Sequence, residues 1–221
     1  MDLRFNHPAN FMIAGPTKSG KSTLVKNILI FRHILFKNIA RSVILVYKRD
    51  QEIYDSLRKL NLVDHFIDIN TNSISSIRDK IKYYKKQDNN WNFGTIIILD
   101  DLLAELSSEF QTLFTVDSHH FSASVVMISQ KLHYQNEIYR TIALNCEYSF
   151  LMKNPRNSSI KHLASQIAPY NVNFPVESYL KATKKPYSYL LYDASQDAPD
   201  VTRLRSHIFP FEFPMKVYVK N

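Results

Sequence analysis

The amino-acid sequence predicts an α/β protein whose mostly parallel β-sheet is flanked by helices. Apolar runs of strand length alternate along the chain with segments of helical spacing, an order typical of parallel sheets. Residues 95–99 form a continuous apolar run, which suits a parallel strand covered on both faces. Residues 15–23 read GPTKSGKST and match the pattern G-x-x-x-x-G-K-[ST], a phosphate-binding loop that joins a strand to a helix.

The spacing of apolar residues predicts the other elements. We expect strands at 10–14, 42–47, 65–69, 95–99, 124–129 and 148–152, with late strands at 187–192 and 202–208. We expect helices at 21–33, at 51–60, from 74 onward, after a capping box formed by Ser108 and Gln111, and around 160–167. Residues 87–92 are predicted to form a polar loop. We interpret residues 1–221 as a single domain, with a core at about 8–168 and a small C-terminal β extension at about 169–221.

The loop at 15–23 carries most of the predicted chemistry. It contains two of the three glycines of the chain, which let successive backbone N–H groups turn toward phosphate oxygens. A helix that begins near Lys21 adds its positive N-terminal end, Lys21 reaches the β- and γ-phosphates, and the Ser22 hydroxyl binds Mg²⁺. A chance match in a glycine-containing turn is the alternative, and the apolar run before the loop and the helical spacing after it argue against that. The predicted cofactors are ATP and Mg²⁺, and the predicted binding residues are Gly15, Pro16, Thr17, Lys18, Ser19, Gly20, Lys21, Ser22 and Thr23.

A pair of carboxylates supplies the second half of the predicted site. Asp100 and Asp101 end the apolar run at 95–99. In P-loop NTPases an acidic residue at such a strand end holds Mg²⁺, and we assign this role to Asp100. A strand followed by a helix cap is the alternative. Asp101 is the candidate general base that orients the attacking water, and Glu105 is the second candidate.

The strand at 124–129 ends at Gln130. In the additional-strand class of P-loop ATPases, the corresponding strand lies between the P-loop strand and the acidic strand. The polar residue at its end then faces the γ-phosphate, and Gln130 occupies that place. A solvated strand end is the alternative.

Composition and charge restrict the classes of protein to which the chain can belong. The 221 residues are 45% apolar and 22% charged, which is ordinary for a soluble globular protein. No apolar run reaches the roughly 18 residues of a membrane span, and the start of the chain does not read as a signal peptide. The single cysteine, Cys146, excludes an internal disulfide and a cysteine-cluster metal site, and it fits a reducing, intracellular compartment. The net charge of +8 favours a polyanionic partner.

These motifs together make the sequence resemble the DNA-packaging ATPases of double-stranded DNA viruses and Polinton/Maverick-type elements, in the FtsK–HerA superfamily. The resemblance covers most of the chain, and the whole series is more specific than the P-loop and the acidic strand alone. The segments that carry it are GPTKSGKST at 15–23, IIILDD at 96–101, LFTVDSHH at 113–120, VVMISQ at 125–130, RTIALNCEYSFLMKNPR at 140–156, HLASQIAP at 162–169 and KPYSYLLYD at 185–193.

The resemblance implies a RecA-like P-loop core, a homo-oligomeric ring, and ATP-driven translocation of double-stranded DNA into a capsid. The implied partners are duplex DNA, other copies of the chain and a capsid or portal component, with no membrane. The implied location is the host nucleus, the viral assembly site or the virion itself. One departure concerns the acidic pair: many members of the superfamily have Asp-Glu where this chain has Asp100-Asp101.

Ring ATPases of this kind commonly use an arginine to stabilise charge on the transferring phosphoryl group. Arg140 and Arg156 both follow the Gln130 strand, and we favour Arg140. A structural salt bridge is the alternative role for either residue.

Two other functions stay open at this point. The first is a nucleoside or small-molecule kinase that uses the same P-loop, although neither an arginine-rich lid nor an acceptor pocket is clear in the sequence. The second is a non-motor nucleic-acid-binding protein in which nucleotide only switches the conformation. Stimulation of ATP hydrolysis by duplex DNA separates the packaging ATPase from both.

Overall fold

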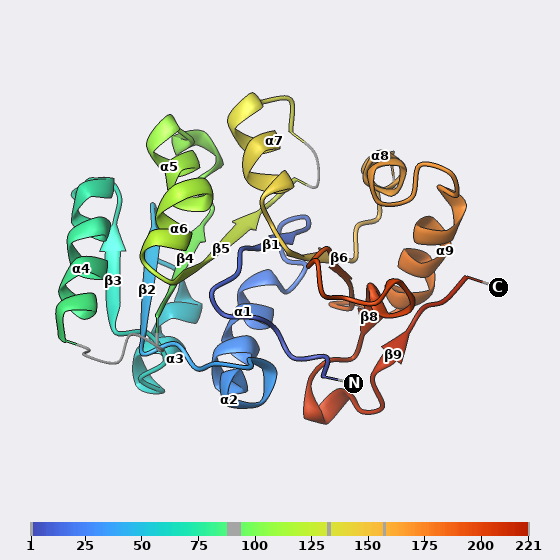
Figure 1. Cartoon of the computed structure of the whole chain (residues 1–221), viewed down its shortest axis with the longest axis horizontal. Coiled ribbons are helices and arrows are strands. Elements are labelled where there is room, and N and C mark those ends of the chain that lie inside the picture. The colour runs from blue at the N-terminus through green and yellow to red at the C-terminus, as the bar shows by residue number, and fades with distance from the viewer. Residues whose placement is uncertain (1, 88–93, 132–133, 157, 221) are drawn as a thin grey trace.

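The computed structural model describes residues 2–87, 94–131, 134–156 and 158–220. Its strands form one sheet in the order β3-β2-β4-β5-β1-β6-β7-β8-β9 (Figure 1). The predicted polar loop at 87–92 lies almost entirely outside the described residues. The strands are β1 Phe11–Ala14, β2 Ser42–Tyr47, β3 His65–Asp68, β4 Thr95–Asp100, β5 Ala123–Ser129, β6 Tyr148–Met152, β7 Tyr189–Asp193, β8 Leu204–Ser206 and β9 Lys216–Val217.

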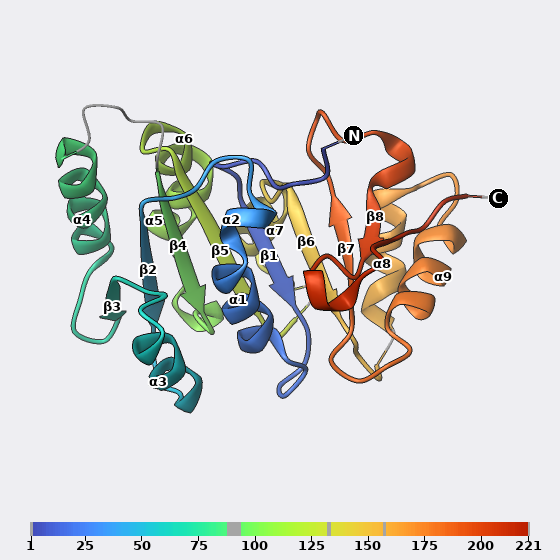
Figure 2. The ribbon, with the colours of Figure 1, turned by 90° about the horizontal axis from the view of Figure 1, so that it is seen from below.

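The sheet is parallel from β3 to β6 and antiparallel from β6 to β9. Strand β5 lies between β4 and β1, so the predicted additional-strand order is confirmed. Figure 2 shows β1 and β4 pointing the same way and β7 pointing the opposite way. Because parallel strands end at the same edge of a sheet, the segments that follow β1, β4 and β5 meet there.

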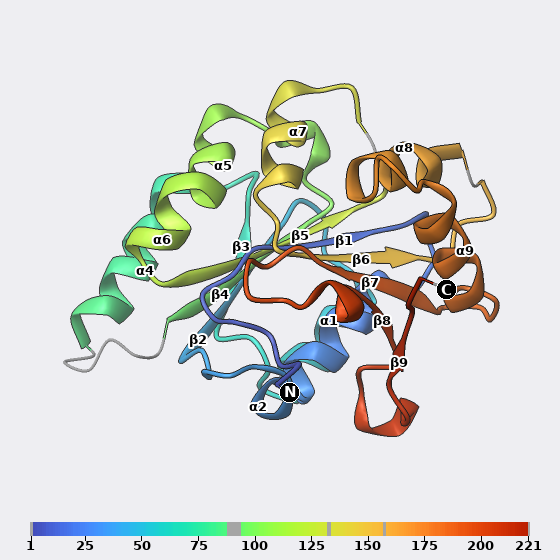
Figure 3. The same ribbon diagram turned by 45° about the vertical axis from the view of Figure 1, so that its right-hand side comes forward.

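Helices cover both faces of the sheet. Figure 3 shows α1 and α2 on one face and α4 to α8 on the other. Buried side chains of α3 join the core on the α1 face, and those of α9 pack with α8 against β6, β7 and β8. The helices are α1 Lys21–Ile30, α2 Arg32–Leu35, α3 Glu52–Lys59, α4 Ile74–Gln87, α5 Ser108–Thr112, α6 Ser118–His120, α7 Glu137–Leu144, α8 Ser158–Ile167 and α9 Asn173–Ala182.

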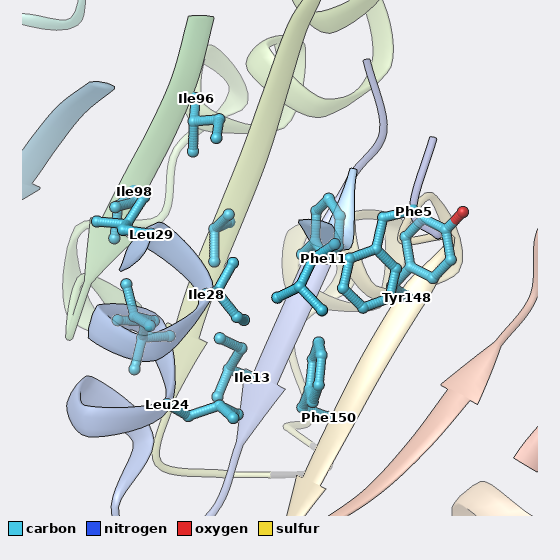
Figure 4. Packing of buried hydrophobic residues seen from close by; sticks show 14 of the residues in the cluster. Phe5, Phe11, Ile13, Leu24, Ile28, Leu29, Ile96, Ile98, Tyr148 and Phe150 are labelled. Atoms are coloured by element: carbon cyan, nitrogen blue, oxygen red, sulfur yellow. The ribbon is translucent and has the colours of Figure 1, made fainter. Parts of the chain in front are cut away.

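The core on the α1 face holds the P-loop helix against the centre of the sheet. Leu24 and Ile28 of α1 lie against strand side chains such as Ile13, which is fully buried (Figure 4). Beside them, Phe11 stacks on Tyr148 with ring centroids 4.9 Å apart. Burying one such side chain contributes about 1.5–3 kcal/mol. The position of α1, and therefore of the loop before it, is fixed by packing as well as by the loop itself.

Several boundaries differ from the sequence predictions. The predicted helix at 21–33 is interrupted at Phe31, which has φ −98° and ψ 14°, and the chain continues as α2. The predicted capping box at Ser108 is wrong, because the helix cap is Ser107. Ser107 is extended and its hydroxyl oxygen accepts from the Phe110 N–H at 3.5 Å, whereas Ser108 is already helical.

Among the α-helices and strands of the described residues, α7, α9 and β9 were not expected from the sequence. Helix α7 has only eight residues, so it contains too few repeats of the apolar pattern to predict a helix from the sequence. Helix α9 contains Pro175, which usually interrupts a helix but is tolerated in the first turn. The predicted C-terminal β extension exists as antiparallel strands, and they continue the main sheet through the pairing of β7 with β6. The division of the chain near residue 168 stays a prediction.

Candidate nucleotide-binding site

The loop between β1 and α1 has the geometry that the P-loop pattern requires. The Gly15 N–H donates to the Ser129 carbonyl oxygen at 3.1 Å, which ties the loop to the end of β5. A Cβ at position 15 would lie 2.5 Å from the Cβ of Met152, so the packing requires glycine. Gly20 has φ 95°, in the left-handed region, and it immediately precedes α1. The first turn of a helix leaves N–H groups without intrahelical acceptors, and these suit a phosphate.

Lys21 is folded back onto the loop. Its Nζ donates to the carbonyl oxygens of Gly15 and Pro16, at 2.8 Å and 2.9 Å. Burial lowers the pKa of Lys21, and the charges of Asp100 and Asp101 act in the opposite direction. The ammonium group is therefore held against the start of the loop, and the two carboxylates are close enough to affect its pKa.

Asp100 is buried at the end of β4, with 4% of its surface exposed. Its Oδ2 accepts hydrogen bonds from the Tyr54 hydroxyl at 2.8 Å and from the Gln51 side-chain amide at 3.2 Å. Burial raises the pKa of Asp100, and the hydrogen bond from Tyr54 opposes that change. The next helical turn, Leu103–Glu105, has no side-chain cap, so the described contacts of Asp100 are not those of a helix cap.

Asp101 is exposed and belongs to a short chain of hydrogen bonds. Its Oδ1 accepts from the Gln130 Nε2 at 2.8 Å, and the Gln130 Oε1 accepts from the Thr17 hydroxyl at 3.3 Å. These residues come from the turn after β4, the end of β5 and the P-loop, and the structure brings all three together. Asp101 has φ 55°, a left-handed conformation in which aspartate is several-fold enriched. This backbone conformation suits an aspartate at position 101.

Glu105 is held away from this chain of hydrogen bonds. Its carboxylate forms an ion pair with Lys48, which follows β2. A cavity of about 1400 Å³, the nucleotide cavity, has Asp101 and Gln130 among its described lining residues but not Glu105. The geometry therefore favours Asp101 over Glu105 as the base.

Neither predicted arginine lines the nucleotide cavity. Arg140 is exposed in the first turn of α7 and borders a second, smaller cavity of about 220 Å³ together with residues of α8. Arg156 is exposed in the segment after β6. Within the described residues, neither guanidinium takes part in an ion pair.

The nucleotide cavity brings together most of the predicted site residues, but Gly15, Pro16 and the two arginines do not line it. It is lined by the loop from Thr17 to Thr23, by Asp100, Asp101 and Gln130, and by the start of α3. Its opposite wall comes from the C-terminal residues 185–189 and 206–216, which sequence reasoning did not assign to the site. Only the clustering of aromatic residues near the C-terminus could have drawn attention to that wall.

The residues of this cavity fit Mg²⁺ bound with nucleotide. The Ser22 hydroxyl and the Asp100 carboxylate both line it, and Mg²⁺ prefers such oxygen ligands together with phosphate oxygens. The Ser19 hydroxyl oxygen is buried beside Gly15 and has no hydrogen-bond partner among the described residues. This arrangement suits an anionic ligand in the loop.

The strand order and the loop together define the fold of a P-loop NTPase of the additional-strand class. No protein-family profile and no curated protein matches the sequence. The chain is similar to the solved genome-packaging NTPase B204 from Sulfolobus turreted icosahedral virus 2, with a TM-score of 0.56 and 13% identity over 96% of this chain and 97% of that one. It is also similar to B204 from Sulfolobus turreted icosahedral virus, described as a DNA-packaging ATPase, with a TM-score of 0.57 over 98% and 100% of the two chains.

A third solved structure extends the likeness beyond viruses. EssC (ATPases 2 and 3) from Geobacillus thermodenitrificans matches with a TM-score of 0.59 and 14% identity, over 96% of this chain and 40% of EssC. At these identities the comparisons establish the shared fold. That fold is the one that the resemblance of the motifs implied.

Proposed function

We propose that the chain is an ATP hydrolase that translocates double-stranded DNA into a viral-type capsid. The observation that carries this proposal is the meeting of the P-loop, Asp100, Asp101 and Gln130 in one cavity. The fold likeness to two packaging NTPases over nearly the whole of both chains supports the choice of function. The net charge of +8 suits a DNA partner.

In the proposed reaction, water attacks the γ-phosphorus and the bond to the β–γ bridging oxygen breaks, giving ADP and inorganic phosphate. The Asp101 carboxylate accepts the proton of the attacking water. Gln130 holds Asp101 in place through their 2.8 Å hydrogen bond, and Thr17 fixes the orientation of the Gln130 amide. Ser22 and Asp100 would hold Mg²⁺, which would supply positive charge to offset that of the phosphate oxygens. Lys21 must leave the loop carbonyls to reach the β- and γ-phosphates.

The assignment of Asp101 predicts a split between binding and turnover. Asp101→Asn should lower the turnover number for ATP by about 10²–10⁴-fold, because an amide cannot accept the proton. ATP binding should persist, since the P-loop is unchanged. Glu105→Gln is the matched comparison and should affect turnover much less, because Glu105 is paired with Lys48. Normal hydrolysis by Asp101→Asn, with loss in Glu105→Gln, would reverse the assignment.

The experiment that tests the proposed function is the response to duplex DNA. Steady-state ATP hydrolysis should rise when duplex DNA of arbitrary sequence is added. DNA affinity should fall with salt, with a log–log slope of about −0.9 per phosphate contacted. Binding that is indifferent to salt, or absent at low salt, would contradict a motor. Transfer of the γ-phosphate to a nucleoside or another small hydroxyl acceptor, without DNA stimulation, would indicate a kinase instead.

The same proposal includes a ring of identical subunits and a capsid or portal component as partners. Within the described residues, no helix is both long enough and apolar enough to span a membrane. Electron microscopy of the protein with ATP and duplex DNA would test the ring directly. The proposed place of action is the viral assembly site or the host nucleus.

A further inference from the structure

The nucleotide cavity has a second wall that the chemistry at the phosphates does not use. This wall contains five aromatic residues from the C-terminal part of the chain, of which Tyr189 and Phe209 are buried and Tyr187, Phe211 and Phe213 are exposed. Tyr187 precedes β7, and the two exposed phenylalanines lie in or after the short 3₁₀ turn Pro210–Glu212, between β8 and β9. Figure 3 shows this turn before β9 on the α1 side of the sheet.

The side chains of Tyr187, Phe211 and Phe213 are unusually exposed for their size. The exposed fractions are 71% for Tyr187, 61% for Phe211 and 83% for Phe213. Aromatic side chains normally bury most of their surface, and a buried one covers roughly 150–250 Å². Three exposed rings that line a single cavity therefore form an apolar surface suited to a flat, aromatic ligand.

The wall runs beside the helical segment that follows the P-loop, from Gly20 to Phe31. Thr23, Asn27 and Phe31 are spaced by four residues and share one face of the helical segment that follows the loop, and the first two line the cavity. Asn27 is roughly 9 Å along the helix from Lys21, at 1.5 Å per residue. Farther along, the Phe31 ring lies 5.7 Å from the Phe211 ring between centroids. On the other side, a Cβ at Gly20 would lie 3.4 Å from the Cβ of Tyr187.

The C-terminal turn is held in position by its own contacts. Phe209 is buried, and Phe211 stacks on it with centroids 5.3 Å apart and an angle of 3° between the rings. The Glu212 carboxylate accepts a hydrogen bond from the Tyr189 hydroxyl at 2.7 Å. The rings are therefore presented by a fixed segment, and a ligand would not have to order it.

We propose that Phe211 and Phe213 form a stacking site for the base of the bound nucleoside triphosphate, with Tyr187 beside Gly20 at the phosphate end of the same wall. This inference rests on the ATP-binding part of the proposed function. The phosphate chain lies in the P-loop, the ribose passes over Thr23 and Asn27, and the base lies against the aromatic wall. Stacking tolerates any base, because every base has a π-face, so the site accepts ATP and GTP with similar affinity.

Comparison of ATP with inorganic tripolyphosphate separates the contribution of the base to binding from that of the phosphates, because tripolyphosphate can occupy the P-loop but has no base. The dissociation constants of ATP and tripolyphosphate, each with Mg²⁺, are measured by calorimetry for the unaltered protein and for the Phe213→Ala variant. Removing one stacking ring should weaken the affinity for ATP by about 10-fold and leave the affinity for tripolyphosphate unchanged. Phe213→Tyr keeps a ring and should bind ATP normally. Tyr170→Ala, which removes a fully exposed ring outside the cavity, should leave both ligands unaffected.

The outcomes separate this inference from the proposed function. Equal weakening of both ligands in Phe213→Ala, or no change in either, would overturn the stacking site while the P-loop stands. Equal affinity of the unaltered protein for ATP and tripolyphosphate would do the same. A protein that binds neither ligand would overturn the nucleotide site and the stacking site together. A selective loss of ATP affinity in Phe213→Ala would support the stacking site. If duplex DNA does not stimulate ATP hydrolysis by the unaltered protein, that result contradicts only the motor.

Discussion

Replacing Lys21 with alanine is expected to reduce ATP hydrolysis by at least about 10³-fold and to weaken ATP binding. The phosphate chain loses the ammonium group that the P-loop pattern assigns to it, and charge that develops on the transferring group is no longer offset by Lys21. The measurement is steady-state phosphate release, together with the dissociation constant of ATP. The substitution also removes two hydrogen bonds from Lys21 to the loop carbonyls, so circular dichroism and thermal unfolding should be compared with those of the unaltered protein.

Lys26→Ala provides the matched control for this prediction. Lys26 lies on the same helix, α1, but does not line the nucleotide cavity. This variant loses one lysine and the same net charge as Lys21→Ala. Retained hydrolysis in Lys26→Ala assigns the loss to the position of Lys21, whereas equal losses in both would mean that the helix or the total charge is responsible.

The second large effect is expected for Arg140→Ala, through the neighbouring subunit of the proposed ring. Arg140 is exposed on α7, outside the nucleotide cavity of its own chain, and has no ion-pair partner among the described residues. A role at the phosphates therefore requires the site of another subunit. Loss of such an arginine lowers the rate by about 10³-fold or more. Steady-state phosphate release from the assembled variant, compared with the unaltered protein, checks the size of this loss.

Mixing two inactive variants tests whether this arginine acts between subunits. Arg140→Ala subunits keep an intact P-loop, and Lys21→Ala subunits keep an intact arginine. Some interfaces in a mixed ring then contain both parts, so mixing should restore part of the ATPase activity. Mixing Lys21→Ala with Asp101→Asn is the control and should restore nothing, because each variant is defective in its own cavity.

Assembly must be checked in the same samples. If mixed rings form and the first pair restores no activity, Arg140 acts within its own subunit or has a structural role. The same test should then be applied to Arg156, which is also exposed and also lacks an ion-pair partner within the described part of the chain.

The sequence by itself determined the elements that depend on neighbouring residues. The apolar runs became β1, β2, β4, β5 and β6, since a buried parallel strand needs little more than a continuous apolar segment. The P-loop was readable for the same reason: Gly20 at positive φ and the helix that starts at Lys21 are local features. The position of β5 between β4 and β1 was predicted from the additional-strand class of P-loop ATPases, and the strand pairing confirms it.

Only the tertiary structure decided which distant side chains meet at the site. Tyr54 and Gln51 hold Asp100, and Lys48 holds Glu105 away, although no local pattern marks these partners. The wall formed by residues 206–216 reaches the P-loop because β7 to β9 reverse direction and extend the sheet past β6. A strand or helix follows from the few residues around it, whereas a contact across the sheet depends on where every intervening segment packs. For that reason the phosphate-binding half of the cavity could be predicted from the sequence, and the aromatic half became visible only in the folded chain.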